Sequence, residues 1–353
     1  MAVSILNEFS GKKILVAPLD WGLGHAARCI PIIKQLLSQG NEVIVASAGR
    51  AAHLLQIEFP DLAFEELPAY DIVYTDSQSL NGVMLQQLPR ILGVISKEHD
   101  VLKKLIKKHE LDMVISDNRF GLHSLMVPCY FITHQLNVRD SKGRAWLEWL
   151  MRKVNFNYIK KFHGCWVPDY EGENNLTGEL SHGVETPFEV TFIGPLSRFR
   201  NQWMSNSLEK TYKMVVLLSG PEPQRTVFEK IIVSHLDKLN ISILVLLGKT
   251  ESSRFVKHSQ FVDMVDHLPT DRLFNILFNC EVVVSRSGYS TIMDLEAIGK
   301  KAILVPTPGQ TEQEYLADLF KTKKVFFSEP QITFDLYRGM KETERYSGFL
   351  LKF

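Results

Sequence analysis

The chain has 353 residues, 45% of them hydrophobic, and its 40 lysines and arginines balance 40 aspartates and glutamates. A chain of this length exceeds what one hydrophobic core normally serves, so we expect two domains. The even charge balance argues against nucleic acid as the partner. No apolar run is long enough to span a membrane, no signal peptide opens the chain, and the four separated cysteines fit neither a zinc site nor a disulfide framework. We therefore expect a cytoplasmic protein with reduced thiols.

The first half of the chain, residues 1–196, alternates buried strands with helical stretches, which predicts an α/β domain with a parallel sheet. The predicted strands are Lys13–Ala17, Glu42–Ala46, Met113–Ser116, Tyr130–Thr133 and Cys165–Val167.

The first predicted strand is followed by a glycine turn, Gly22-Leu23-Gly24-His25-Ala26-Ala27, that opens a helix. Its glycines let a ligand approach the backbone closely. The turn also satisfies G-x-G-x-x-G/A of dinucleotide-binding folds, but the second strand runs into Val45–Gly49 without the acidic residue that would hold a ribose. Arg50 could serve a 2′-phosphate and keeps that alternative open.

His25 in this turn is a candidate general base, because an imidazole titrates near neutrality and can take a proton from a hydroxyl group. Asp117 stands at the carboxyl end of another predicted strand of the same sheet, where it can orient the imidazole. The alternatives are that His25 caps or packs its helix and that Asp117 caps the next one.

A polar, irregular linker, residues 197–213, separates this half from a second α/β domain at residues 214–330. The terminal segment, residues 331–353, mixes aromatic and charged residues and predicts a helix. The strands predicted in the second domain are Met214–Leu218, Ile243–Leu247, Val282–Val284 and Ala302–Val305.

A polar turn follows the strand Val282–Val284 and opens a helix, as in a βαβ unit. Glycine amides and serine hydroxyls at such a helix N-terminus fit a diphosphate, to which an arginine adds charge. Thr291 and Asp294 also form a capping-box pattern, so helix initiation alone is the alternative. The anion-binding residues predicted here are Arg286, Ser287, Gly288, Ser290 and Thr291.

A second polar loop contains Gln310, Glu312, Gln313 and Glu314, whose side chains can chelate the vicinal hydroxyls of a sugar or ribose. Exposed polar residues at a helix start are the alternative. Because the helix N-terminus and Arg286 can neutralise a diphosphate, and because no Asp-x-Asp sequence occurs, we expect neither a metal ion nor a cofactor.

Residues 285–317, SRSGYSTIMDLEAIGKKAILVPTPGQTEQEYLA, resemble the donor-binding signature of MurG-like glycosyltransferases, GT-B enzymes that use UDP-N-acetylglucosamine. The resemblance implies two Rossmann-like domains whose parallel sheets face each other across a cleft, with the terminal helix crossing back onto the first domain. It also implies that Asp294 contacts the nucleotide ribose and that Gln313 and Glu314 hold the donor sugar. The loop containing Ser219 and Gly220 resembles the loop that lies beside the donor phosphates.

The turn with His25 resembles the first loop of MurG-like and UDP-glycosyltransferase proteins, in which glycines line the cleft and the histidine faces the acceptor. The latter proteins place a His–Asp dyad at positions comparable to His25 and Asp117. The residues that this resemblance and the strand ends assign to acceptor binding are Gly22, Gly24, Asn118, His134 and Gln135.

We therefore expect a glycosyltransferase that moves a sugar from a nucleotide-sugar donor, UDP-linked, to a hydroxyl acceptor, with inversion and without a metal ion. One alternative is a sugar-nucleotide 2-epimerase of the same fold, which would consume no acceptor. Another is a non-catalytic nucleotide-sugar-binding or membrane-docking protein.

The segment 139–161 carries seven basic and two acidic residues interleaved with aromatic side chains. Such a helix can lie on an anionic membrane, and MurG-like enzymes use a basic, apolar patch to reach a lipid-linked acceptor. The alternative is ordinary packing, because Trp146, Leu147, Leu150 and Val154 follow helical spacing and can face a core.

Overall fold

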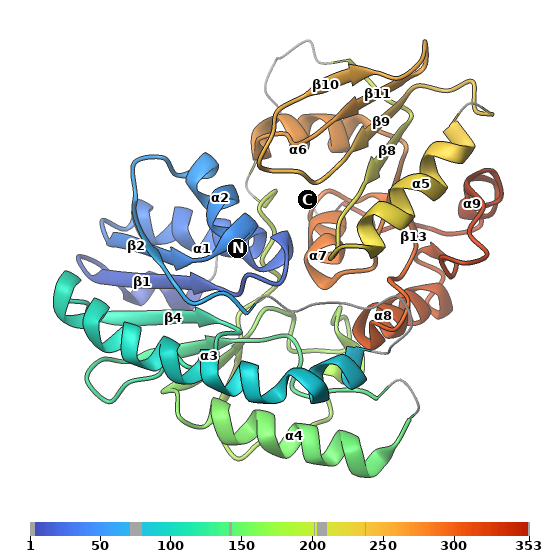
Figure 1. Cartoon of the computed structure of the whole chain (residues 1–353). Helices are drawn as coiled ribbons and strands as arrows, with labels where there is room; N and C mark the ends of the chain where they lie inside the picture. Colours follow the sequence, from blue (N-terminus) through green and yellow to red (C-terminus); the bar gives the residue numbers. More distant parts are fainter. Residues whose placement is uncertain are drawn as a thin grey trace. The chain divides into compact units, whose positions relative to one another are not determined.

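The computed structural model describes residues 4–70, 80–140, 143–200, 202, 210–236 and 238–351. They form two compact α/β units (Figure 1). The first unit is built from the described residues up to 70 and from Asn81–Leu196, and the second from Ser197 onward. Each unit has its own seven-stranded sheet.

The sheet of the first unit has the strand order β3-β2-β1-β4-β5-β6-β7, and all neighbouring strands are parallel. Both faces of a parallel sheet are usually covered by helices, which explains why the central strands are continuous apolar runs. The strands are β1 (Lys13–Pro18), β2 (Glu42–Ser47), β3 (Ala63–Glu66), β4 (Met113–Asp117), β5 (Cys129–Ile132), β6 (Gly164–Val167) and β7 (Val190–Phe192).

The main core of this unit joins the strands to two helices. Leu15 of β1 and Val114 of β4 pack in one cluster with Leu102 of α3 and Ile159 of α4, all fully or almost fully buried. Each side chain of this size contributes roughly 1.5–3 kcal/mol when it is buried. The helices are α1 (Leu23–Ser38), α2 (Gly49–Glu58), α3 (Leu80–His109) and α4 (Ala145–Ile159), with 3₁₀ turns at Ser4–Glu8 and Gly178–Leu180.

The sheet of the second unit has the order β10-β11-β9-β8-β12-β13-β14, and only the pairing of β10 with β11 is antiparallel among the strands described. Its strands are β8 (Met214–Leu217), β9 (Ile243–Leu246), β10 (Phe255–Lys257), β11 (Val262–Val265), β12 (Val282–Ser285), β13 (Lys301–Leu304) and β14 (Phe327–Ser328).

Side chains of the central strands of this sheet pack with Phe228 of α5 and Leu336 of α9 in one buried cluster. The described contacts of the terminal helix include β13 and β14 of the second sheet. The crossing onto the first domain that the resemblance implies stays a prediction. The helices are α5 (Gln224–Leu236), α6 (Thr270–Asn279), α7 (Tyr289–Ala297), α8 (Thr311–Thr322) and α9 (Leu336–Thr343).

The predicted α/β class with parallel sheets is confirmed, and every strand predicted from an apolar run is present. Of the predicted linker, residues 201 and 203–209 lie outside the described residues, as do residues 141 and 142 of the basic segment. No helix in the described part of the chain is both long and apolar enough to cross a membrane.

Candidate active site

His25 lies in the first turn of α1, directly after the loop that leaves β1. Gly22 precedes the helix with a φ of 129°, a backbone conformation that glycine adopts easily and that is strained for residues with a side chain. A Cβ at this position would meet no atom within 4 Å, so the backbone here is open to a ligand. Gly24, also predicted for this site, is the second residue of α1.

The imidazole of His25 reaches Asp117. Its Nδ1 lies 3.0 Å from Asp117 Oδ1. Strands β1 and β4 are parallel neighbours with Pro18 in register with Asp117, so β4 ends beside the turn that carries His25. The Asp117 side chain is fully buried, whereas 18% of the His25 side chain is exposed. The structure therefore brings the two predicted residues together and leaves the histidine accessible.

Arg28, which the sequence reasoning missed, completes this cluster. Its Nε donates to Asp117 Oδ2 at 2.6 Å and its Nη2 donates to Asp117 Oδ1. Residues three apart share one face of a helix, so Arg28 stands beside His25. A signal was present in the sequence: an arginine within the apolar run of α1 needs a buried counter-charge.

This arrangement fixes the charge states of the pair. Burial alone would raise the pKa of Asp117, but the charge of Arg28 and then that of His25 outweigh it, so this pKa lies well below its usual range. Burial lowers the pKa of His25, and Arg28 lowers it further. Asp117 is therefore a carboxylate and His25 a neutral imidazole at neutral pH, as a general base requires.

The neighbouring strand end adds a second histidine. His134 follows β5 and is buried, and its Nδ1 lies 2.8 Å from Arg28 Nη1. Asn118 and Gln135, also predicted here, are partly exposed at the ends of β4 and β5. Asn118 adopts a positive φ of 60° and donates its backbone N–H to the carbonyl of Ile132. Among the described contacts of the acceptor residues proposed after these strands, the one that reaches the His25 cluster through a side chain is that of His134 with Arg28.

A buried network supports this edge of the first sheet. Arg119 is fully buried and pairs with Glu98 of α3 at 2.8 Å and with Asp20 at 3.1 Å. Tyr70 donates its hydroxyl to Glu98 at 3.0 Å and its backbone N–H to Asp20 at 3.2 Å. Because Asp20 lies in the turn before α1, the network ties that turn to α3.

In the second unit, α7 begins directly after β12 at the edge predicted to bind a diphosphate. Gly288 is its N-cap, so Thr291 and Asp294 lie inside the helix and the alternative capping box does not form. Ser290 and Thr291 are partly exposed in the first turn. The hydroxyl of Ser287 is buried and donates to the Gln313 carbonyl at 2.7 Å, which fastens this turn to α8.

The second polar loop is held by its own side chains. Gln313 accepts the backbone N–H of Thr307 through Oε1 at 2.9 Å and donates through Nε2 to Gln310 at 2.5 Å. Glu314 accepts the backbone N–H of Gly309 at 2.9 Å. These groups shape the loop, and Glu312 beside them is partly exposed in the first turn of α8.

Two residues predicted to bind the donor make their described contacts within the second unit. Arg286 is almost fully buried, donates to the carbonyls of Val305 and Pro306 at 3.1 and 3.2 Å, and has its guanidinium 4.2 Å from the centroid of the Phe228 ring. Burial lowers its pKa to about 9. In its described contacts Arg286 therefore ties loops together inside the unit.

The second of these residues is Asp294. Its carboxylate accepts from Ser197 Oγ at 2.7 Å and Arg198 Nε at 3.3 Å, and burial raises its pKa although Arg198 opposes this. Asp294 thus holds the start of the linker, a contact between residues far apart in the chain that no local pattern predicts.

Two more hydroxyl groups lie at this edge of the second sheet, that of Ser285 at the end of β12 and that of Thr307 just after β13. Both are buried and have no hydrogen-bond partner among the described residues. Buried polar groups normally have one. A Cβ on Gly220, which has a φ of 105°, would lie 3.8 Å from Thr307 Oγ1, so the loop with Ser219 and Gly220 borders Thr307. No three His, Cys, Asp or Glu side chains come together as a metal site in the described ranges.

Comparisons with known proteins agree across both units. Residues 221–329 match the glycosyltransferase family 28 C-terminal domain, and residues 12–138 match glycosyl transferase family 1. An uncharacterized glycosyltransferase of Methanosarcina mazei is 25% identical over 365 aligned positions, which cover 95% of this chain and 92% of the relative.

Two further similarities concern the proteins that the signature resembles. The UDP-N-acetylglucosamine--N-acetylmuramyl-(pentapeptide) pyrophosphoryl-undecaprenol N-acetylglucosamine transferase of Prochlorococcus marinus is 35% identical over 77 residues, covering 22% of this chain and 21% of that protein. The crystal structure of MurG from Acinetobacter baumannii matches with a TM-score of 0.53 at 11% identity, covering 95% of this chain and 92% of that one. The second likeness shows a shared fold.

Proposed function

We propose that the chain, a glycosyltransferase with the GT-B fold, transfers a sugar from a nucleotide-sugar donor to a hydroxyl group of an acceptor, with inversion. The observation that carries the proposal is the contact of the partly exposed His25 with the buried carboxylate of Asp117 at 3.0 Å. A neutral imidazole backed by a carboxylate is the arrangement that deprotonates a hydroxyl nucleophile.

In the proposed reaction, Nε2 of His25 takes the proton of the acceptor hydroxyl while the oxygen of that hydroxyl bonds to the anomeric carbon of the donor sugar. The bond from that carbon to the donor phosphate oxygen breaks, and the electron pair leaves with the nucleoside diphosphate. Asp117 stays ionised and stabilises the imidazolium that forms. Attack from the side opposite the leaving group inverts the anomeric carbon.

We assign the donor to the edge of the second sheet where β8, β12 and β13 end. The amides at the start of α7 favour an anion, and the hydroxyls of Ser285 and Thr307 supply donors that are otherwise unused among the described residues. Ser219 and Gly220 border the same place, and the loop Gln310–Glu314 can hold sugar hydroxyls. The local similarity to a UDP-N-acetylglucosamine-dependent enzyme supports a UDP-linked donor.

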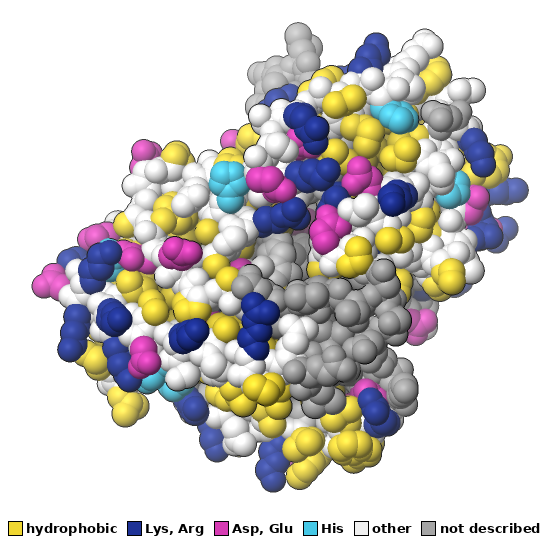
Figure 2. Space-filling view, viewed as in Figure 1, with side chains coloured by type: hydrophobic (Ala, Val, Ile, Leu, Met, Phe, Trp, Pro, Cys, Tyr) yellow, Lys and Arg dark blue, Asp and Glu magenta, His cyan; other side chains and the backbone are white. Residues whose placement is uncertain are grey.

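The acceptor we propose is lipid-linked, and α4 supports a contact with the membrane. Trp146, Trp149, Leu150 and Val154 are 44–65% exposed, so the packing alternative does not describe them. Figure 2 shows hydrophobic side chains interspersed with Lys and Arg over this helix. Among the apolar residues of α4, Leu147 is one that is buried.

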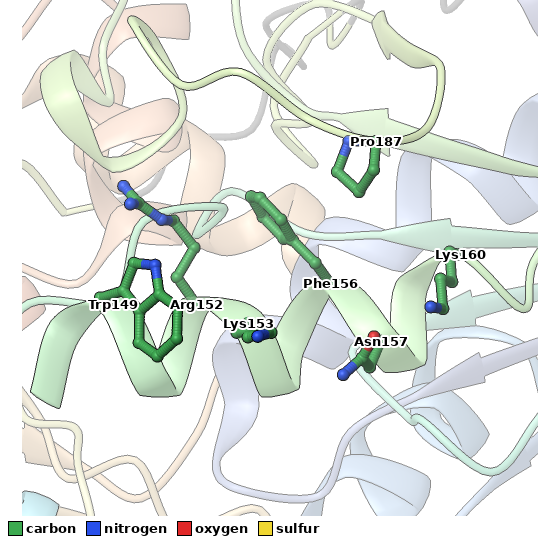
Figure 3. Close-up of a pocket in the computed structure, with 7 residues that line it drawn as sticks. All are labelled: Trp149, Arg152, Lys153, Phe156, Asn157, Lys160 and Pro187. Atoms are coloured by element: carbon green, nitrogen blue, oxygen red, sulfur yellow. The ribbon is translucent and has the colours of Figure 1, made fainter. Parts of the chain in front are cut away.

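A groove of about 330 Å³ runs along α4. Five of its lining residues lie on α4, Lys160 follows the end of that helix, and Pro187 lies on a neighbouring loop (Figure 3). The ring of Trp149 lies 4.7 Å below the Lys153 ammonium, an arrangement that pairs an apolar surface with charge. Such a surface fits an interface of acyl chains and anionic headgroups.

The donor assignment is tested by titrating the purified protein with UDP-, GDP-, TDP- and CMP-sugars and recording the thermal unfolding transition. We expect UDP-sugars to raise it most, because a ligand that binds only the folded state stabilises that state. Thr307→Val should weaken donor binding by roughly 3–10-fold, the effect of one lost hydrogen bond.

Thr343→Val is the matched control, since Thr343 is a buried threonine of the same unit that lies on α9. It should leave donor affinity at the wild-type value. No shift with any nucleotide sugar, or equal affinity of Thr307→Val and wild type, would refute the assignment.

A further inference from the structure

Arg28 contacts three functional side chains of the first unit at once. Only 2% of it is exposed, and its guanidinium lies within hydrogen-bond distance of Asp117, His25 and His134. A guanidinium has five N–H donors in a rigid fork and no acceptor. Each nitrogen or oxygen that it contacts must therefore either accept a hydrogen or turn its own hydrogen elsewhere.

The contact with His134 has one chemical solution. Nη1 of Arg28 lies 2.8 Å from Nδ1 of His134, so Nδ1 must accept. A neutral imidazole that accepts at Nδ1 carries its proton at Nε2. His134 is thus held in the tautomer whose Nε2 is a donor.

His25 has two neighbours at the same ring nitrogen. Its Nδ1 lies 3.0 Å from Asp117 Oδ1 and 2.9 Å from Arg28 Nη2. Nη2 carries two hydrogens and gives one of them to Asp117 Oδ1, its nearer contact. Because Oδ1 can only accept, His25 satisfies its own contact with Oδ1 by donating from Nδ1, which leaves the lone pair at Nε2.

We propose that Arg28 is a positioning residue that fixes the two histidines in opposite neutral tautomers, His25 protonated at Nδ1 and His134 protonated at Nε2. The proposal rests on the proposed function of His25 as the base. The titratable and charged groups that surround His25 are Arg28 and Cys29 of α1, Asp117 of β4 and His134 after β5, with Cys29 Sγ 3.6 Å from Asp117 Oδ2. Within this set, Arg28 alone contacts both rings and the carboxylate.

The consequence is a division of labour between the rings. His25 offers a lone pair at Nε2 that can take the acceptor's proton, whereas His134 carries a buried N–H at Nε2. If His25 changed to the other tautomer, Nε2 could no longer accept a proton. If His134 changed, its Nε2 would become an acceptor instead of a donor. Arg28 therefore acts on the reaction through its neighbours and need not touch the substrate.

The test is a long-range ¹H–¹⁵N correlation spectrum of the full chain labelled with ¹⁵N-histidine, with signals assigned from His25→Gln and His134→Gln. We expect a protonated Nδ1 on His25 and a protonated Nε2 on His134 at neutral pH. The same tautomer on both rings, or protonation of His25 at Nε2, would overturn the proposal. The spectrum needs no substrate, so the tautomers can be established even if the chain transfers no sugar.

Arg28→Lys keeps the charge but cannot donate to Asp117 and His134 in one fixed fork. We expect His134 to become a mixture of tautomers and kcat to fall by about 10²-fold through lost orientation, with the KM for the donor unchanged. Arg225→Lys is the matched control, because Arg225 is a similarly buried, carboxylate-paired arginine of the second unit whose described contacts include neither histidine. It should leave both tautomers as in wild type. An unchanged His134 signal in Arg28→Lys would contradict the proposal.

Discussion

His25 and Asp117 form a hydrogen-bonded pair although they belong to two elements far apart in the chain. Asp117 ends β4 and His25 opens α1, and the parallel pairing of β1 with β4 sets them side by side. Burial and the charge of Arg28 together determine their charge states. Arg28 stabilises the carboxylate of Asp117, and both burial and Arg28 disfavour a positive charge on the imidazole of His25. The proposed general base depends on this local balance.

The balance predicts the pH dependence of activity. A protonated His25 cannot accept a proton, so kcat/KM should fall as the pH drops through the pKa of His25. Because burial and Arg28 lower this pKa, the acidic limb should lie below about pH 6.5, the ordinary value for histidine. The measurement is a pH–rate profile of sugar transfer.

His109→Gln is the control for this profile, since His109 lies at the end of α3, where it contacts Glu65. The variant should keep the wild-type limb. A wild-type limb at or above pH 6.5 would show that another group, or a His25 in a different environment, controls the rate.

The sequence predicts where residues at strand ends lie, but it does not predict which way a buried side chain points. Arg286 stands in a turn that resembles an anion site, but its side chain points into the unit and binds carbonyls. Arg28 was missed for the same reason, because its partners Asp117 and His134 are far away in sequence. Neither side-chain direction can be read from local spacing alone.

Helix α3 is joined to the edge of the first sheet by close backbone packing as well as by the Glu98–Arg119 pair. Gly121, just after β4, approaches α3 so closely that a Cβ there would lie 2.3 Å from the Ile95 carbonyl oxygen and 2.5 Å from Glu98 Cβ. This contact requires a residue without a side chain. It positions Arg119 and, through Asp20, the turn before α1.

Gly121→Ala should therefore destabilise the first unit by roughly 1–3 kcal/mol, because the backbone must move to relieve the overlap. The measurement is the free energy of unfolding from the thermal or denaturant transition. Gly93→Ala is the control on α3 itself: a Cβ there meets nothing within 4 Å, so it should stabilise by roughly 0.5–1 kcal/mol. Equal stability of Gly121→Ala and wild type would contradict the packing described.

In helix α4 the spacing of apolar residues does not show which of them are buried. Its apolar residues follow helical spacing, which favours packing against a core, but Trp146, Leu150 and Val154 are exposed. The spacing identifies an apolar face without identifying what covers it. The surrounding basic residues then favour an anionic membrane surface.

We expect the protein to co-sediment with liposomes that contain anionic lipid and much less with neutral ones, because cationic side chains add about 1 kcal/mol each near such a surface. The double substitution Trp146→Ser and Trp149→Ser should reduce this binding several-fold through lost apolar contact. Phe255→Ser, which removes an equally exposed aromatic side chain from β10, should not. Binding that is independent of anionic lipid, or equal for all variants, would refute the membrane contact.

The chain as a whole consists of two α/β units, each with a parallel core that its apolar runs predict. Those runs, such as Val282–Val284 in β12, also locate the loops that carry both candidate sites, because ligands bind at the carboxyl ends of such strands. The strand pattern does not determine which contacts individual side chains make. Gln313 and Asp294, which the resemblance assigns to the donor, here contact Thr307 and Ser197 of the second unit. These contacts follow from packing and not from the strand pattern.

The division of roles between the units gives the most direct test of the account. The measurement is release of nucleoside diphosphate from the nucleotide sugar that binds best, with and without candidate hydroxyl acceptors, for wild type and His25→Gln. We expect acceptor-dependent release by wild type and a loss of about 10²–10⁴-fold in kcat for the variant, with donor affinity retained. An equal rate of transfer by His25→Gln, or release by wild type that no acceptor increases, would contradict the proposed mechanism.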